Sequence, residues 1–436
     1  MSVRLGYLDQ AAHLSMRATG RRQLVQLGWL YRRPVDPEGI ARFHRNFGRG
    51  LAGRRIERSP LPFGRHRWVA APDPAPLKFS EIVRPGEELG DWFDERSQIP
   101  VDPEHGPGWH MAVQPFSAGA TAVTVVGSHC LLDGVAVLTA AAHAADDRAE
   151  PMDWPPPRSR SPVRAVLADL AQTCRDIPDL VAAARAGLRG IGGEPGDRTG
   201  VVVEAADGDR LVRVPALNVF VSARAWDEVA ARFGGNGYSL LAGLAAELGR
   251  RMRRCGDGRA AELLIALSER TVGDTRANAL RMATVRVDPA TVTTDLTATR
   301  TAIRAAVADA RTTGDGMFAM LPLAPFVPLR VARRLGAAMF GSQPISCSNL
   351  GELDPAVCRP DGTPADSLFL RPVDQNVREH EITTGGGQLV VVAGRVGGVV
   401  TIGIVGYTPG GDNTRAGLRA LVDAALGAFG LIGEFV

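Results

Sequence analysis

The chain has 436 residues, more than one compact core usually holds, so two domains or one two-lobed fold are expected. Charged residues make up 22% and hydrophobic residues 45%, a globular composition that excludes extensive disorder. The formal net charge of +3 arises from 50 basic and 47 acidic residues, and so small a surplus does not indicate a nucleic-acid partner.

The cysteines and histidines do not form a metal or disulfide pattern. Five cysteines are widely spaced without a CxxC pair, which argues against a disulfide framework and a zinc site. His105 and His110 have no carboxylate or thiolate at metal spacing and are interpreted as non-metal residues. No apolar run approaches the roughly 18 residues of a spanning helix, and residues 1–10 lack an apolar signal core. We therefore predict a cytoplasmic protein without a metal.

The first part of the chain alternates between helical and strand patterns. Ile40, Phe43 and Phe47 have the spacing of one helix face, and the β-branched run 121–127 is typical of an inner strand. The predicted elements, in chain order, are a helix at 7–15, a strand at 24–30, a helix at 37–47, strands at 66–71, 109–114 and 121–127, and an Ala-rich helix at 135–145.

A Pro-rich passage at 152–162 then indicates a linker between lobes. We predict an N-terminal lobe at 1–155, a linker at 156–200 with one crossing helix at 163–188 and a Gly-rich loop at 190–200, and a C-terminal lobe at 201–436. The second lobe is predicted to contain strands at 211–221, 263–267, 282–287, 344–350, 367–373, 388–395 and 399–407, helices at 238–254, 293–311 and 414–429, and a hairpin turn at Gly397-Gly398.

Candidate chemistry lies where strand 121–127 ends. His129 follows the strand, Asp133 comes four residues later, and Gly134 is expected to permit a tight turn into the next helix. A histidine has an unperturbed pKa of about 6.5 and can accept a proton near neutrality and return it afterwards. On spacing alone, a structural histidine with satisfied hydrogen bonds is the alternative. The apolar strand before the site and the Ala-rich helix after it favour an HxxxDG site.

This segment resembles the site of the wax ester synthase and diacylglycerol acyltransferase family, which is related to peptide-synthetase condensation domains and chloramphenicol acetyltransferase. The resemblance extends over most of the chain. Further similar segments are Tyr7-Leu8-Asp9, Leu61 to Gly64 with Trp68-Val69, Pro100 to Pro103 with Gly108 to His110, Leu267 to Arg270 with Asn278, and Ser346 to Gly351.

The resemblance implies a fold and a set of roles. The fold would be α/β, with two similar chloramphenicol-acetyltransferase-like lobes and an active-site tunnel between them. His129 would be the general base, Asp133 its structural support and Arg270 a candidate partner of Asp133. The candidate substrate-binding residues are Ser128, Gly134, Ser348 and Asn349, and the last two would donate hydrogen bonds to a developing oxyanion. The alternative role for Asn349 is to fix a turn at the end of a strand.

Three segments depart from the family pattern. Ser128 replaces the first histidine of the usual HHxxxDG, Gly351-Glu352-Leu353 replaces a Pro-Gly-Pro, and Gly237-Tyr238-Ser239 replaces an Asn-Asp pair. The histidine expected to act as base is retained. These departures argue against triacylglycerol or wax synthesis more than against acyl transfer.

The sequence therefore predicts an acyltransferase that moves an acyl group directly from an acyl-CoA or acyl carrier protein to a small alcohol or amine. No cofactor is expected beyond this thioester substrate. One alternative is a free-standing condensation enzyme of natural-product biosynthesis that forms an amide or ester. A second alternative is a non-catalytic protein that binds an acyl group or a partner.

Three other patterns in the sequence indicate a different function less strongly than the HxxxDG segment indicates acyl transfer. A GxGxxG match at Gly48 to Gly53 follows a helix, whereas a dinucleotide site needs a strand there. Cys130 adjoins His129, but neighbours in an extended chain point to opposite sides, so we do not expect a Cys/His pair. The apolar stretch 317–340 is broken by prolines and is interpreted as core, with an acyl-chain mouth or peripheral lipid contact as the alternative.

Overall fold

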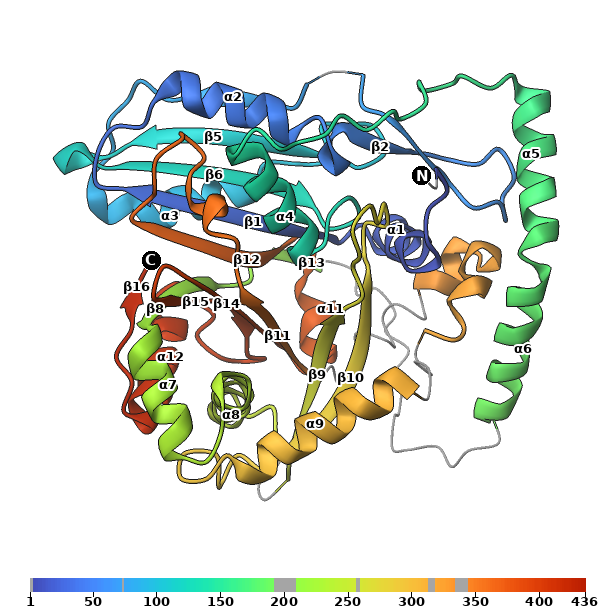
Figure 1. Ribbon diagram of the computed structural model, residues 1–436. Coiled ribbons are helices and arrows are strands. Elements are labelled where there is room, and N and C mark those ends of the chain that lie inside the picture. The colour runs from blue at the N-terminus through green and yellow to red at the C-terminus, as the bar shows by residue number, and fades with distance from the viewer. Residues whose placement is uncertain (1–2, 73, 192–208, 256–258, 313–317, 334–343) are drawn as a thin grey trace.

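The computed structural model describes residues 3–72, 74–191, 209–255, 259–312, 318–333 and 344–436 (Figure 1). Parts of two predicted segments lie outside the described residues, namely 192–200 of the Gly-rich loop and 317 and 334–340 of the proline-broken stretch. The described chain forms two main sheets, each with helices, and the predicted mixed α/β architecture is confirmed.

The first sheet places the His129 segment at its centre. Its strand order is β12-β1-β6-β5-β4, and β6 pairs antiparallel with both neighbours. Every residue of β6 is buried, which explains its run of β-branched and small residues. The strands are β1 (Arg22–Tyr31), β4 (Leu77–Phe79), β5 (Trp109–Pro115), β6 (Thr121–Ser128) and β12 (Ser367–Gln375).

Helices of the first part cover this sheet. α2 packs against α4, and its buried Ile40, Phe43 and Phe47 contribute to the core of this lobe. Asp36 caps α2 by accepting hydrogen bonds from the amides of residues 38 and 39. The elements are α1 (Tyr7–Thr19), α2 (Pro37–Phe47), α3 (Leu89–Ser97) and α4 (Gly134–Ala145), with a small hairpin of β2 (Arg54–Glu57) and β3 (Arg67–Ala70).

The second sheet has the order β10-β9-β11-β14-β15-β8-β16. Four helices lie along it and share its hydrophobic core (Figure 1). The strands are β8 (Ala216–Ser222), β9 (Ala261–Ser268), β10 (Leu280–Val287), β11 (Ile345–Glu352), β14 (Gln388–Val396), β15 (Val399–Tyr407) and β16 (Glu434–Phe435). The helices are α7 (Ala223–Arg232), α8 (Gly237–Arg251), α9 (Thr297–Thr312) and α12 (Arg415–Phe429).

Strand β12 joins the two lobes. It belongs to the predicted second lobe, 201–436, but it pairs with β1 in the first sheet, so the sheets do not follow the predicted division of the chain. Leu368, Phe369 and Leu370 of β12 are all buried, because β12 also packs on β15. The approach is so close that a Cβ on Gly403 of β15 would lie 2.4 Å from the Leu370 carbonyl oxygen.

Two predicted elements are each divided in the structure. The predicted helix 163–188 is two helices, α5 (Pro162–Arg175) and α6 (Ile177–Ile191), because Pro178 lacks the amide that would continue the hydrogen-bond ladder. The predicted strand 211–221 is β7 (Leu211–Val212) and β8, with Pro215 between them. Shorter elements are β13 (Val377–Arg378), α11 (Glu379–Thr384) and η4 (Leu321–Phe326). Among the described helices, none has the length and apolar character needed to cross a bilayer.

Candidate active site

His129 is presented at the end of β6 by a backbone that is held on both sides. Its amide donates a hydrogen bond of 2.9 Å to the Gln23 carbonyl oxygen, and its carbonyl oxygen accepts one of 3.3 Å from Asn278 Nδ2. The imidazole is half-buried and makes no hydrogen bond to any residue in the described ranges. The ring is therefore positioned without having its nitrogen atoms occupied by protein groups.

Asp133 stabilises the turn that follows His129. Its Oδ1 accepts a hydrogen bond of 2.7 Å from the Ala136 amide and thereby caps α4. Its Oδ2 accepts from the Ala279 amide at 2.9 Å and from Arg270 Nη2 at 2.8 Å. Both carboxylate oxygens are engaged in structural contacts, an arrangement that suits a supporting residue better than a proton acceptor.

Arg270 fixes this turn to the second sheet. It lies between β9 and β10, and the side chains of Arg270 and Asp133 are only 9% and 6% exposed. The same guanidinium donates to the Ala277 and Arg276 carbonyl oxygens at 3.0 and 3.1 Å. One buried ion pair thus connects the start of α4 to the loop before β10, across the two lobes.

A second buried contact between the lobes involves Asp9 and Asn278. Asp9 is 0% exposed and accepts hydrogen bonds from the Ala277 amide at 3.1 Å, the Asn278 amide at 2.8 Å and Asn278 Nδ2 at 3.1 Å. Burial raises the pKa of Asp9, and the nearby Arg54 charge opposes that rise. Because Asn278 Nδ2 also donates to the His129 carbonyl oxygen, Asp9 acts indirectly on the position of His129.

Arg54 is the buried cation of this region. It lies 3.8 Å from the ring centre of Trp68 and donates 2.9 Å to the Leu131 carbonyl oxygen, inside the His129 turn. Burial lowers the pKa of Arg54 to about 9. Sequence reasoning did not find Arg54, since an arginine in a hairpin strand carries no local signal of burial. Asp9 and Asn278 were visible only as parts of the family resemblance, without partners.

The Cys130 side chain does not point away from His129 as their adjacent positions in the sequence suggested. Residues 129 and 130 lie in a turn, so the expectation that they point to opposite sides of an extended strand is wrong. Both border one cavity of about 20 Å³, which α1 also lines. Burial raises the pKa of the Cys130 thiol to about 12, which keeps it protonated. Burial, rather than strand alternation, argues against a thiolate nucleophile.

The candidate substrate-binding residues come from both lobes. Ser128 is buried at the end of β6, where its Oγ accepts a hydrogen bond from the Cys130 amide at 3.3 Å. Ser348 and Asn349 lie on β11, and Asn349 Oδ1 accepts from the Gly351 amide at 3.0 Å. This contact lies within β11, where the register with β14 shifts between Asn349 and Glu352, and the turn-fixing role stays the alternative for Asn349. No hydrogen bond joins Ser348 or Asn349 to His129 among the described residues, and their oxyanion role stays a prediction.

Gly134 is not required for a tight turn, contrary to expectation. It is the first residue of α4 and does not have a positive φ. A Cβ there would lie 3.5 Å from Leu350 Cδ2 and 3.8 Å from Leu370 Cδ2, which are ordinary contact distances. The space in front of Gly134 is therefore bordered by β11 and β12.

Gly134→Ala is expected to fold as well as the parent, because the helical conformation accepts alanine and the added methyl group fits. If this space receives substrate, activity should fall by about tenfold or more while the melting temperature stays within a few degrees of the parent value. Thermal melting and steady-state rates on the same preparation test this. Unchanged rates would remove Gly134 from the substrate site.

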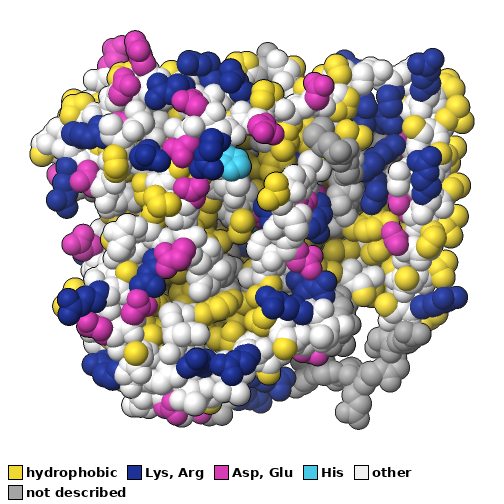
Figure 2. Space-filling model, viewed as in Figure 1, with side chains coloured by type: hydrophobic (Ala, Val, Ile, Leu, Met, Phe, Trp, Pro, Cys, Tyr) yellow, Lys and Arg dark blue, Asp and Glu magenta, His cyan; other side chains and the backbone are white. Residues whose placement is uncertain are grey.

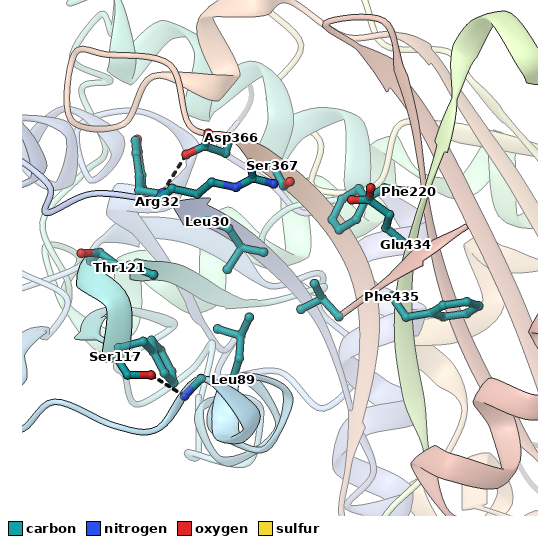
Figure 3. Close-up of a pocket in the computed structure, with 15 residues that line it drawn as sticks. Leu30, Arg32, Leu89, Ser117, Thr121, Phe220, Asp366, Ser367, Glu434 and Phe435 are labelled. Atoms are coloured by element: carbon teal, nitrogen blue, oxygen red, sulfur yellow. Dashed lines mark hydrogen bonds between the residues drawn. The ribbon is translucent and has the colours of Figure 1, made fainter. Parts of the chain in front are cut away.

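A larger cavity of about 250 Å³ lies between the lobes but away from His129 (Figure 3). It is lined by Leu30 and Thr121 from the first sheet and by Phe220 and Phe435 from the second. Thr121 begins β6, whereas His129 follows its last residue, so the two sites lie about 25 Å apart at the usual rise of an extended strand. This cavity is not part of the His129 site.

Comparison with known proteins identifies the fold. No known family profile matches the sequence, and no curated protein matches it. The first condensation domain of the CDA synthetase has 13% identity and a TM-score of 0.56, covering 100% of this chain and 99% of its own. TRI101 of F. sporotrichioides, solved with coenzyme A and T-2, has 12% identity and a TM-score of 0.59 over 100% of both chains.

A third solved structure points the same way. The wax ester synthase/diacylglycerol acyltransferase from Marinobacter aquaeolei VT8 has 12% identity and a TM-score of 0.54, with 98% of each chain covered. Likeness at this level of identity concerns the backbone, and it extends over the whole length of all three proteins. This chain therefore has the two-lobed fold shared by condensation domains and these acyltransferases.

Proposed function

We propose that this protein is an acyltransferase in which His129 is the general base. The observation that carries the proposal is the contrast between two neighbouring groups. The His129 ring is half-buried and free of hydrogen bonds to described residues, whereas both oxygens of Asp133 are engaged in structural contacts. The full-length likeness to condensation domains and acyltransferases supports this reading.

The proposed reaction is one direct transfer. A hydroxyl or amine attacks the thioester carbonyl carbon while His129 removes its proton, and a new C–O or C–N bond forms as the C–S bond breaks. The protonated His129 then returns the proton to the departing thiolate, so the base is regenerated. The oxyanion formed during attack needs hydrogen-bond donors, for which Ser348 and Asn349 remain the candidates.

The donor thioester is proposed to be an acyl-CoA or an acyl carrier protein. TRI101, one of the similar structures, was solved with coenzyme A bound, so an acyl-CoA is the first donor to test. The likeness to the first condensation domain of the CDA synthetase favours a second candidate, a free-standing condensation enzyme that would take its acyl group from a carrier protein. Both candidates use the same base, and they differ in the donor.

The test is release of free thiol from a thioester, measured with and without acceptor. Short and long acyl-CoAs and the matching acyl carrier proteins serve as donors, with a panel of small alcohols and amines as acceptors. Acceptor-dependent thiol release, together with the ester or amide product by mass spectrometry, is the expected result. Binding of the donor without turnover across the panel would favour the non-catalytic alternative.

Cys130→Ala is expected to retain activity within about twofold of the parent, because the raised pKa of the buried thiol makes it a poor nucleophile. Intact-mass measurement after incubation with donor alone should show no added acyl group. An adduct mapped to Cys130 that disappears when acceptor is added would overturn direct transfer.

A further inference from the structure

Helices α5 and α6 follow one another along one edge of the molecule (Figure 1). Their acidic side chains point toward the protein. Asp169 is buried between Arg4 and Arg160, at 2.6 and 2.8 Å. About two turns later, Asp176 pairs with Arg65 at 3.2 Å. These contacts attach the pair to the first lobe through charged groups, which is the reverse of the usual arrangement for a surface helix.

The opposite side of the pair is apolar and faces solvent. Figure 2 shows hydrophobic side chains along its outer edge. The larger ones are substantially exposed, with Val163 at 68%, Leu167 at 60%, Ile177 at 50% and Leu188 at 72%. The outer stripe, as we define it, consists of eight exposed residues: Val163, Leu167, Leu170, Cys174, Ile177, Val181, Ala184 and Leu188.

The spacing of the outer stripe indicates what it can contact. Its steps along the chain alternate strictly between four and three residues, a period of 3.5, which is the pattern of a coiled-coil seam. Small exposed residues flank the stripe, such as Ala168, Ala171 and Ala182, and allow a second helix to approach closely. A bilayer-surface helix usually has a broader apolar face with aromatic residues, and residues 162–188 contain none.

The charges beside the outer stripe select the partner. Arg164, Arg175 and Arg185 are exposed there and form no ion pair with described residues. The acidic residues of the pair point elsewhere: Asp169 and Asp176 are bound on the inner side, and Asp179 accepts a hydrogen bond of 2.8 Å from the Tyr7 hydroxyl. The exposed edge is therefore cationic as well as apolar.

A second copy of the chain is a poor match for these charges. If two stripes paired antiparallel with Cys174 opposite Ile177, Arg164 of one copy would lie beside Arg185 of the other. In a parallel pair, the flanking position that faces Arg185 would be Leu180, and the one that faces Arg164 falls before the start of α5, so neither supplies a negative charge. Neither arrangement neutralises the arginines.

We propose that the outer stripe of α5 and α6 binds an acidic amphipathic helix of another protein. The partner helix would bury apolar residues of heptad spacing against the stripe and place Asp or Glu beside Arg164, Arg175 and Arg185. This surface is separate from the His129 site, so the inference does not depend on the proposed enzyme activity.

The probe is a labelled synthetic helix of about four heptads with Leu at the seam and Glu at the flanking positions, compared with the same peptide carrying Lys. Fluorescence anisotropy with the full chain should show the Glu peptide binding about tenfold or more tightly, with weaker binding at higher salt. Leu167→Glu/Val181→Glu should abolish binding. Arg164→Glu/Arg175→Glu/Arg185→Glu should reverse the preference toward the Lys peptide.

Two exposed residues elsewhere provide matched controls. Val272→Glu and Arg224→Glu, the latter on α7, should leave peptide binding unchanged. Equal binding of the two peptides, or binding to neither, would overturn the proposal. So would a dimer in sedimentation that Leu167→Glu/Val181→Glu dissociates, which would identify a second copy as the occupant. Binding only to vesicles that contain phosphatidylglycerol would identify a lipid surface instead.

Discussion

Replacement of His129 by alanine is expected to lower the rate of acyl transfer by about 100- to 10,000-fold, the range that a positioned base contributes. The ring is half-buried and makes no hydrogen bond to described residues, so its removal takes away a proton acceptor without breaking a structural contact. The backbone contacts to Gln23 and Asn278 remain in the variant. Single-turnover rates with saturating donor and acceptor measure the loss.

The matched control is His105→Ala, which removes an imidazole from an exposed loop and should transfer at the parent rate. Both variants should melt near the parent temperature, which separates loss of the base from loss of the fold. A purified His129→Ala variant with full single-turnover transfer would contradict the assignment of His129 as the base.

Elements with strong local signals were predictable from the sequence. Helix α2 spans Pro37–Phe47, as its periodicity predicted, because Asp36, Pro37 and the apolar face all favour the same conformation. Strand β6 extends one residue beyond its predicted end, at Ser128. In both cases the local pattern and the burial in the fold agree.

Elements whose form depends on distant partners were predicted less well. The residues of β12 indicate a buried strand, but nothing in them tells which sheet the strand enters. The break between α5 and α6 at Pro178 was missed because the apolar period continues across it. The sequence predicted a helix that crosses between the lobes, and it did not predict that the apolar side of this helix faces solvent.

The residues of the candidate site also differ in whether a local pattern predicts them or only a contact with a distant part of the chain places them. His129 and Asp133 are four residues apart and were identified together, and Arg270 entered only through a resemblance between sequences. The structure brings Arg270 to 2.8 Å from Asp133 across 137 positions of chain. Arg54 approaches the same turn from a hairpin, and no local pattern predicts a contact of that kind.

Asp133→Asn is expected to lower the free energy of unfolding by about 3–5 kcal/mol, the usual cost of removing one partner of a buried ion pair. The amide oxygen can still cap α4 at the Ala136 amide, so the loss falls on the two contacts of Oδ2, with Arg270 and with the Ala279 amide. Activity should fall along with stability, because the His129 turn loses its connection to the second lobe. Urea unfolding and transfer rates measured on the same preparation test both expectations.

The control is Glu379→Gln, which removes the carboxylate from an exposed pair with Arg210 and should change stability far less. Arg270→Gln should be as damaging as Asp133→Asn, and the double variant should lose less than the sum of the two, since neither charge is then left buried alone. An Asp133→Asn variant that unfolds at the parent urea concentration while its pH–rate profile loses the limb due to the catalytic base would assign the proton to Asp133. His129 would then be the group that only positions it.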